Sequence, residues 1–569
     1  MTVTARQMRT RYLTIVAQDP GLKLNGKILT ERVAVPAECL DRGPLGNRVH
    51  VVDYDASTQT LYSPADLEAS GAYEDAYLKP SSITILGDPG FHAQNVYAIA
   101  MRTLARFESA LGRRVGWGFD SHQLKIAPHA FADPNAFYSR ADQGLMFGYF
   151  PGHSGMVFSC LSHDVVAHET THALLDGLRV GYMDPSSADQ AAFHEAFADL
   201  VALLSVFSLK SVVKRVLSRD SGSNLVPASA ISKAALKQSV LLGLAEEMGD
   251  ELGAYRSSQD ALRRSVELNP SRGLLNQSEF SEAHRRGEVL VAAVMNAFIS
   301  VLSHRISQLG TVTGNMLDLN RVAEEAADVA DYLLTMVIRA IDYTPPMHIN
   351  FNDYLSALLT ADYEIRPDDS RFHFRNIIRE TFTAYGIDPI PTKSAEPGIW
   401  DHLESDVTYR GVHFSSMQHD PEEVFRFIWE NRQSLNLFEQ AGTRITSVRP
   451  CSRLSPEGFQ LKETVAECVQ TLSISVGELK RFKIDVDFPL SAHDEVTLQG
   501  GSTLIFDDYG KLKYAIGTRL HNWEKQSERL RLMVDAGCFD RETTALGRIS
   551  ALHTERFMDT HSHRREGWK

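Results

Sequence analysis

The feature that most constrains this chain is a pair of short motifs that combine histidine and carboxylate side chains. The first, at residues 168–172, reads His-Glu-Thr-Thr-His, and a Glu-x-x-x-Asp pair, Glu195 and Asp199, begins 23 positions after it. Residues four apart share one face of a helix, so both imidazoles of the first motif can reach one metal ion. The glutamate between them is rotated by about 100° and can act beside that ion without binding it. The pattern predicts a zinc site.

The sequence around both motifs is apolar and helical in character. Val165-Val166-Ala167 and Ala173-Leu174-Leu175 flank the first motif, and residues 191–200 form a second apolar segment. Glu195 and Asp199 share one face of that segment. Buried carboxylates need partners, and a zinc ion with its ligand histidine would provide them. The alternative is a chance pattern on the surface.

The spacing predicts a role for each side chain. We expect His168, His172 and Glu195 to be the zinc ligands, and Asp199 to accept a hydrogen bond from a ligand imidazole. Glu169 is the expected general base, which activates the attacking water. A purely structural zinc site fills all four positions with protein ligands and has no use for Glu169. The sequence therefore favours a catalytic site over a zinc-bearing scaffold.

Together the two motifs resemble those of the gluzincin metallopeptidases. The surrounding sequence, over residues 90–390, is similar to the thermolysin and fungalysin families. Within it, Asn135-Ala136-Phe137-Tyr138 is similar to the edge strand that binds the substrate main chain in thermolysin-like enzymes. The resemblance implies that Asn135 and Ala136 contact substrate, and strand addition would hold a peptide in extended form. An ordinary turn around Asp133-Pro134 is the alternative.

The resemblance also implies side chains that stabilise the oxyanion of the reaction. His284, in a His-x-x-Gly-Glu sequence, resembles the fungalysin histidine that faces the zinc; its alternative is a polar residue near a helix start. Tyr182 lies 10 positions after His172, close to where thermolysin-like enzymes carry an oxyanion tyrosine. Its alternative is a loop tyrosine that covers the zinc helix. The substrate-binding arginine of the family stays open among Arg256, Arg263 and Arg264.

The implied fold class is α+β. We expect a thermolysin-like two-lobe core, with a β-rich N-terminal lobe and a mainly helical C-terminal lobe, and an added β-rich C-terminal domain. The expected units are a β-rich lead-in (1–85), the N-terminal lobe with the edge strand (86–165), the helical zinc-binding lobe (166–390), a linker with one helix (391–439), a β-rich accessory domain (440–520) and a charged tail (521–569).

Apolar spacing predicts several long elements. The expected helices are Phe91–Arg113, Asn320–Ile341, Phe351–Asp362 and Pro421–Leu437, and residues 500–516 are expected to form a hairpin around Asp508-Tyr509-Gly510.

Composition narrows the function classes. The 569-residue chain has a net charge of −14, which argues against binding nucleic acid. Residues 1–21 hold no apolar segment long enough for a signal peptide, and the longest apolar stretch, Val289–Leu302, is too short to span a membrane. The five cysteines are scattered, odd in number and without metal-ligand spacing, so no disulfide framework is expected. We expect a cytoplasmic protein.

The sequence therefore predicts a zinc-dependent endopeptidase that acts on peptides or proteins through a Glu169-activated water. Leu200–Phe207, after the third expected ligand, lacks the carboxylates that bind calcium in thermolysin-like enzymes, so calcium is not expected. The alternative function is a latent protease or a non-catalytic zinc-bearing scaffold, whose C-terminal domain binds a regulatory partner.

Overall fold

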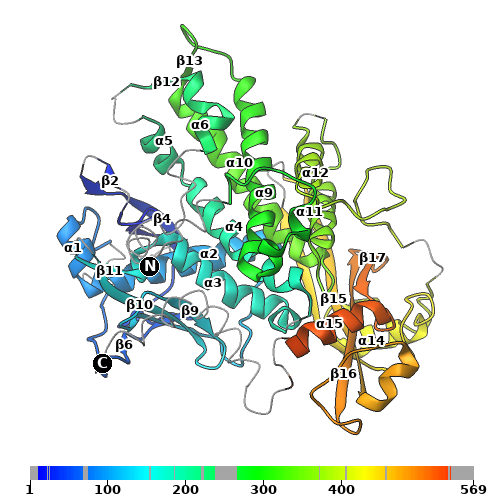
Figure 1. Cartoon of the computed structure of the whole chain (residues 1–569). Coiled ribbons are helices and arrows are strands. Elements are labelled where there is room, and N and C mark those ends of the chain that lie inside the picture. The colour runs from blue at the N-terminus through cyan, green and yellow to red at the C-terminus, as the bar shows by residue number, and fades with distance from the viewer. Residues whose placement is uncertain are drawn as a thin grey trace, which may run out of the picture.

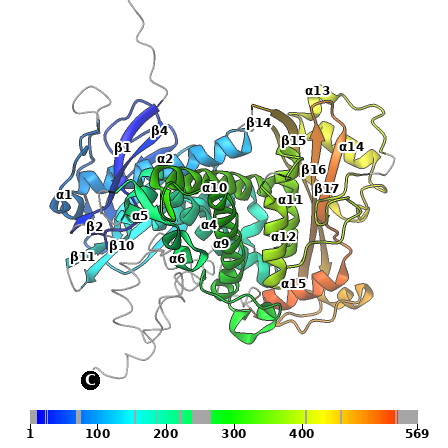
Figure 2. The same ribbon diagram turned by 90° about the horizontal axis from the view of Figure 1, so that it is seen from above.

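The helices and strands of this chain occupy separate regions, which gives an α+β fold. The computed structural model describes residues 10–535 and 539, apart from 22, 25, 68–74, 153–154, 185, 219–222, 238–264, 371, 404–406 and 455–457. Strands from the N-terminal part lie at one end of the molecule, long helices fill the middle, and a second sheet lies at the other end (Figure 1, Figure 2).

A five-stranded mixed sheet is the largest sheet of the N-terminal part. Its strands are β5 (Val49–Val51), β8 (Leu124–Phe131), β9 (Ala136–Ser139), β10 (Gly144–Gly152) and β11 (Gly155–Phe158). β8 runs parallel to β5 and β10, whereas β9 and β11 pair antiparallel with the other side of β10. Among the described strands β9 pairs only with β10, so it is an edge strand there, as the resemblance implied.

Shorter pairs of strands complete the N-terminal part. They are β1 (Thr10–Val16) with β4 (Thr30–Pro36), β2 (Lys23–Leu24) with β3 (Lys27–Ile28), and β6 (Tyr54–Asp55) with β7 (Thr60–Leu61). The short helix α1 (Ser82–Gly87) follows them.

Helix α2 (Pro89–Leu111) packs against both the N-terminal strands and the central helices. It begins two residues before the predicted start, because the Asp88 side chain caps it and Pro89 suits the first helical turn. It ends at Gly112, whose φ of 67° is left-handed. On its buried face, the Asn95 side chain accepts a hydrogen bond from the Val16 main-chain N–H and donates one to the Cys160 carbonyl. The helix therefore fixes β1 against the segment that enters the zinc-motif helix.

The middle of the molecule is helical. Its helices are α3 (His163–Leu178), α4 (Ala188–Phe207), α5 (Lys210–Ser218), α6 (Lys233–Lys237), α9 (Ala283–Ser307), α10 (Leu319–Ala340), α11 (Phe351–Ile365) and α12 (Phe374–Ala384). A short strand pair, β12 (Leu225–Pro227) with β13 (Met316–Asp318), lies beside them. The predicted helices at 320–341 and 351–362 are confirmed as α10 and α11.

Two of these helices, α4 and α9, are long and apolar enough to cross a membrane by length and composition, among the residues that the structure describes. Of the apolar window, 89% in α4 and 72% in α9 is buried inside the fold. A core helix passes the same test, so this is weak evidence for a membrane span.

The C-terminal sheet is a four-stranded antiparallel meander in sequence order. Its strands are β14 (Gly442–Leu454), β15 (Gln460–Ser475), β16 (Glu495–Asp507) and β17 (Leu512–Thr518). The hairpin predicted around Asp508-Tyr509-Gly510 is confirmed by the pairing of β16 with β17. Helix α15 (Trp523–Asp535) follows the last strand.

Part of the segment expected to be a linker packs as core of this C-terminal unit. Helix α13 (Phe414–Met417) buries Met417, and helix α14 (Pro421–Glu430) buries Val424, Phe427 and Ile428, in one core with Leu504 and Phe506 of β16. The predicted extension of α14 to Leu437 is wrong.

The early end of α14 has a local cause at Asn431. The Asn431 side chain accepts from the Thr408 main-chain N–H and donates to the Phe427 carbonyl. These bonds hold the preceding loop against the end of the helix. Asn436, with a φ of 54°, then turns the chain away.

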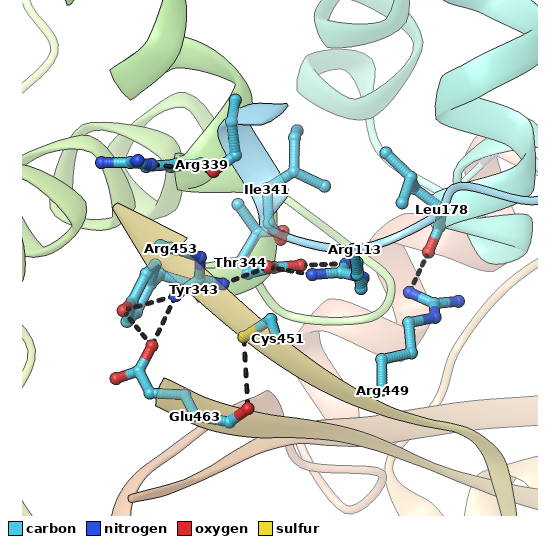
Figure 3. Close-up of polar contacts among 12 residues, drawn as sticks. Arg113, Leu178, Arg339, Ile341, Tyr343, Thr344, Arg449, Cys451, Arg453 and Glu463 are labelled. Carbon is cyan, nitrogen blue, oxygen red and sulfur yellow. Dashed lines mark hydrogen bonds and ion pairs between the residues drawn. The ribbon is translucent and has the colours of Figure 1, made fainter. Parts of the chain in front are cut away.

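Buried ion pairs attach the C-terminal sheet to the helical lobe (Figure 3). Asp342, just after α10, binds Arg113 through two hydrogen bonds of 2.6 Å and also pairs with Arg453 of β14. Arg453 pairs in turn with Glu463 of β15, which accepts a 2.8 Å hydrogen bond from the Tyr343 hydroxyl. The side chains of Asp342, Arg453 and Glu463 are at most 1% exposed. The sheet is thus an integral part of the folded unit.

Candidate metal centre

The two motif histidines project from α3 toward one point. His168 and His172 are one helical turn apart, and their Nε2 atoms lie 2.9 Å from each other. Their rings are nearly perpendicular, with an interplanar angle of 88°. The His172 side chain is 2% exposed and that of His168 is 15% exposed. One edge of the pair therefore opens toward solvent.

Helix α4 brings the third expected ligand to the same point. Glu195 Oε2 lies 3.5 Å from His168 Nε2, and Glu195 Oε1 lies 3.7 Å from His172 Nε2. Helix α4 is apolar over most of its surface and 16 of its side chains are buried, so packing against α3 and α9 fixes its rotation. Its carboxylates then face α3.

Asp199, one turn further along α4, orients His168 from behind. Its Oδ1 accepts a hydrogen bond of 2.8 Å from His168 Nδ1. A carboxylate beside Nδ1 keeps the ring proton on Nδ1, so in the neutral ring Nε2 carries the lone pair. Burial disfavours the charged form of His168, but hydrogen bonds with Asp199 and Glu195 outweigh it and raise its pKa well above the usual value. The surroundings of this imidazole thus favour a positive charge.

His194 is a neighbour of the site that sequence reasoning missed. Its Nδ1 lies 2.7 Å from Nδ1 of His172, and the two rings are stacked. Burial lowers the pKa of His194, so this ring is neutral and can accept the Nδ1 proton of His172. In the sequence, the one available signal was that His194 directly precedes Glu195. Because consecutive residues lie on different faces of a helix, that position alone gave no reason to assign His194 to the site.

Glu169 is buried beside His168, and its carboxyl group is turned toward β9. It is 4% exposed, and it accepts a hydrogen bond from the main-chain N–H of Tyr138 in β9. Its Oε2 atom has no hydrogen-bond partner among the described residues. Burial raises the pKa of Glu169 to about 8, with His168 opposing the rise and Glu195 adding to it.

His284, at the start of α9, lies close to Glu195. Its Nε2 is 3.6 Å from Glu195 Oε2, and its Nδ1 donates a 2.7 Å hydrogen bond to Glu282. Glu282 also caps α9 by accepting from the main-chain N–H groups of His284 and Arg285. Burial alone would raise the pKa of Glu282, but these hydrogen bonds outweigh it and lower the pKa to about 2. Sequence reasoning found His284 and missed Glu282.

Tyr182 does not fit the role that the resemblance implied. It is 3% exposed, and its hydroxyl bonds the Pro345 carbonyl at 2.7 Å and Thr344 Oγ1 at 2.8 Å. These partners lie behind α3, in the segment that connects α10 to α11. The hydroxyl therefore serves a packing contact, which favours the alternative of a tyrosine that covers the helix over the oxyanion role. Proximity in sequence to the zinc helix could not reveal this partner, which lies 163 residues away.

Asn135 and Ala136 open the edge strand near Glu169. The Asn135 side chain is buried, and its Oδ1 accepts a 2.8 Å hydrogen bond from the Ala136 main-chain N–H. The Asn135 carbonyl accepts a hydrogen bond from Gly148 of β10. Arg256, Arg263 and Arg264, the candidates for a substrate-binding arginine, lie outside the described residues.

The donor set fits a zinc ion. Two imidazole nitrogens and one carboxylate are brought within 3.7 Å of one another by two packed helices, which is a common catalytic zinc set that leaves a position open. The ligand atoms of His168, Glu169 and His172, and of His172, His194 and Glu195, form groups compact enough to hold an ion. The outer partners, Asp199 and His194, complete the arrangement expected behind ligand histidines.

Comparison with known proteins gives no family. The chain matches no protein-family model, and no curated protein matches it in sequence. The function is therefore argued from the site itself.

Proposed function

We propose that this protein is a zinc-dependent endopeptidase of the gluzincin type, with a two-lobe thermolysin-like core. The convergence of His168, His172 and Glu195 from two helices is the observation that carries the proposal. Zinc held by these three side chains would polarise the scissile carbonyl and lower the pKa of a water at the open position.

Glu169 is the proton carrier of the proposed reaction. It takes a proton from the attacking water and delivers it to the leaving amine. A carboxyl group whose pKa is raised to about 8 by burial both accepts and returns a proton near neutral pH. Its Oε2 atom, buried and without a partner among the described residues, is the acceptor in this step.

His284 stabilises the negative charge that develops on the substrate oxygen. The Glu282 carboxylate accepts from Nδ1 and holds the ring with Nε2 on the side of Glu195. A preorganised polar group at such a position contributes about 10²–10³ in rate.

The edge strand β9 holds the substrate main chain. It pairs with β10 on one side, and its Tyr138 N–H points to Glu169 on the other. A peptide added along this edge would therefore run past the proton carrier in extended form. Main-chain binding of this kind favours cleavage within a chain over cleavage at its end, and peptides or proteins are the proposed substrates.

A non-catalytic scaffold accounts less well for Glu169. Glu169 is only 4% exposed, and one of its carboxyl oxygens has no hydrogen-bond partner among the described residues. Burying such a group costs free energy of folding. A zinc site that only stabilises the fold would not retain it. Latency remains compatible with the same site, since it concerns access to the site rather than its chemistry.

The deciding experiment measures new amino termini released from a mixed peptide library, with and without a zinc chelator. Wild type should cleave and the chelator should abolish cleavage, whereas Glu169→Gln should keep its zinc and lose activity by about 10³-fold or more. Glu324→Gln, on the exposed face of α10, is the matched control and should behave as wild type. Near-normal turnover by Glu169→Gln would refute the mechanism. Zinc binding without any cleavage by wild type would favour the latent or scaffold alternative.

A further inference from the structure

A second group of metal-ligating side chains is buried in the N-terminal lobe. It consists of His92 on α2, His129 on β8 and Cys160 on the 3-10 turn η1 (Ser159–Leu161). These residues are 1%, 5% and 0% exposed. One ligand atom from each lies within 4.8 Å of the other two. Three elements far apart in sequence thus bring two imidazoles and a thiol together.

The outer nitrogen of each imidazole faces a group that can only accept. His92 Nε2 lies 2.8 Å from the main-chain carbonyl of Ile85. His129 Nδ1 lies 2.8 Å from one carboxylate oxygen of Asp53 and 3.1 Å from the other. A carbonyl and a carboxylate have no proton to donate, so both outer nitrogens carry the ring proton. In neutral rings the two inner nitrogens are then lone pairs.

Those inner nitrogens point at each other. His92 Nδ1 and His129 Nε2 are 2.7 Å apart. Two lone pairs at this distance repel each other unless a cation lies between them. The cation is either an additional proton or a metal ion.

The third donor favours a metal ion over a proton. A shared proton gives no role to the Cys160 thiol, which completes a compact set of three donors. The arrangement repeats that of the catalytic pair, where the Nε2 atoms lie 2.9 Å apart and Asp199 holds the outer nitrogen of His168.

We propose that His92, His129 and Cys160 form a second zinc site, distinct from the proposed catalytic centre. Imidazole and thiolate donors together suit Zn²⁺, while oxygen-preferring cations such as Mg²⁺ and Ca²⁺ do not bind such sets. Asp53 and Ile85 serve as the outer acceptors that fix the two rings. On binding, the thiol of Cys160 loses its proton to solvent and the thiolate sulfur binds the ion.

Aromatic rings surround the two histidines, and a cavity lies beside the outer residues of the site. The ring of Phe158 lies with its centroid 4.8 Å from that of His92 and 5.4 Å from that of His129, and Tyr62 approaches His129 at 5.6 Å. Asp53 and Tyr62 also line a cavity of about 220 Å³.

The position of Cys160 indicates what the ion does. Cys160 lies two residues before Ser162, the N-terminal cap of α3, and α3 carries His168 and His172. Binding at His92, His129 and Cys160 would cross-link α2, the N-terminal sheet and the entry to α3. The ion therefore stabilises the lobe that carries the edge strand, without contact with substrate.

The test uses the full-length protein with Co²⁺ in place of zinc. A thiolate bound to Co²⁺ gives a sulfur-to-metal absorption band in the near ultraviolet, whereas the donors His168, His172 and Glu195 include no sulfur. Wild type and His172→Ala should both show this band, and Cys160→Ser should lose it. Cys468→Ser, which changes a buried cysteine of the C-terminal sheet, is the matched control and should keep it.

Zinc content gives a second readout that does not depend on activity. Wild type should bind about two zinc ions per chain, and His172→Ala and Cys160→Ser about one each. Absence of the cobalt band in folded wild type, or the same zinc content in Cys160→Ser and wild type, would overturn the second site. Because wild type alone decides the first of these, the proposal stays testable even if Cys160→Ser does not fold. Failure of the catalytic proposal would instead appear as loss of cleavage with the cobalt band intact.

Discussion

His168 donates a 2.8 Å hydrogen bond from Nδ1 to the carboxylate of Asp199, one turn beyond Glu195 on α4. The same helix therefore supplies the carboxylate of a proposed ligand, Glu195, and the carboxylate that orients the ring of another, His168. Rotation of α4 would displace both together, so the packing of its apolar surface between α3 and α9 sets the geometry of the centre.

Removing the orienting carboxylate should weaken zinc binding without removing a ligand. We expect Asp199→Ala to lower zinc affinity about 10–100-fold, because His168 loses the acceptor that fixes its tautomer and raises its basicity. Competition with a chromogenic chelator would measure the affinity. Glu324→Gln should keep the wild-type value, and an unchanged affinity in Asp199→Ala would show that Asp199 does not orient the ring.

Substitutions at His284 and at Tyr182 should have clearly different effects on kcat. His284 faces Glu195 across 3.6 Å, so His284→Ala should reduce kcat about 10²–10³-fold with little loss of zinc. The Tyr182 hydroxyl bonds Thr344 and Pro345, so Tyr182→Phe should retain most of its kcat and lose about 1 kcal/mol of stability. Steady-state kinetics and thermal unfolding of both variants would check this. A large loss of kcat in Tyr182→Phe would restore the oxyanion role.

How much of the fold and of the site could be predicted from the sequence depended on how local each interaction is. The spacing of His168 and His172 is a property of one helix, and the apolar periodicity of α2, α10 and α11 is local as well, so all were predictable. Asp199 was predictable because it shares a helix face with Glu195. The position of β9 at an edge of the sheet was expected from the resemblance, and the described strands agree with it.

Interactions between distant segments were beyond the sequence. Tyr182 finds its acceptor 163 residues away, and no pattern near Tyr182 encodes that partner. Cys160 had no metal-ligand spacing because its companions His92 and His129 come from a helix and a strand well before it. Tertiary packing brought these groups together, and local chemistry such as the side-chain bonds of Asn431 ended α14 early.

Glu282 should position His284 for the reaction. Because the Glu282 carboxylate accepts from Nδ1 of His284, Glu282→Gln should weaken that hold on the ring and lower kcat about 10-fold. The zinc content should not change, since Glu282 contacts none of the three expected ligands directly. Steady-state kinetics and metal analysis of wild type and variant would measure both quantities. An unchanged kcat would remove Glu282 from the positioning of His284.

The buried carboxylate at the junction with the C-terminal sheet should give an acid-dependent stability. Burial alone would raise the pKa of Asp342, but Arg113 and Arg453 outweigh it and hold the pKa well below its usual range. A lowered folded-state pKa contributes stability that is present above the unfolded value of about 4 and is lost as the pH falls below it.

Asp342→Asn should therefore be destabilised most at neutral pH. We expect a loss of about 3–5 kcal/mol near pH 7, because two buried guanidinium groups lose their charged partner. The loss should shrink as the pH falls below about 4, because the unfolded wild-type chain then binds a proton at Asp342 that the folded protein does not bind. Urea unfolding across this range would measure it, with Asp508→Asn, in an exposed pair of the same sheet, as the control. A difference between wild type and Asp342→Asn that stays constant with pH would show that the ionised carboxylate does not hold the sheet in place.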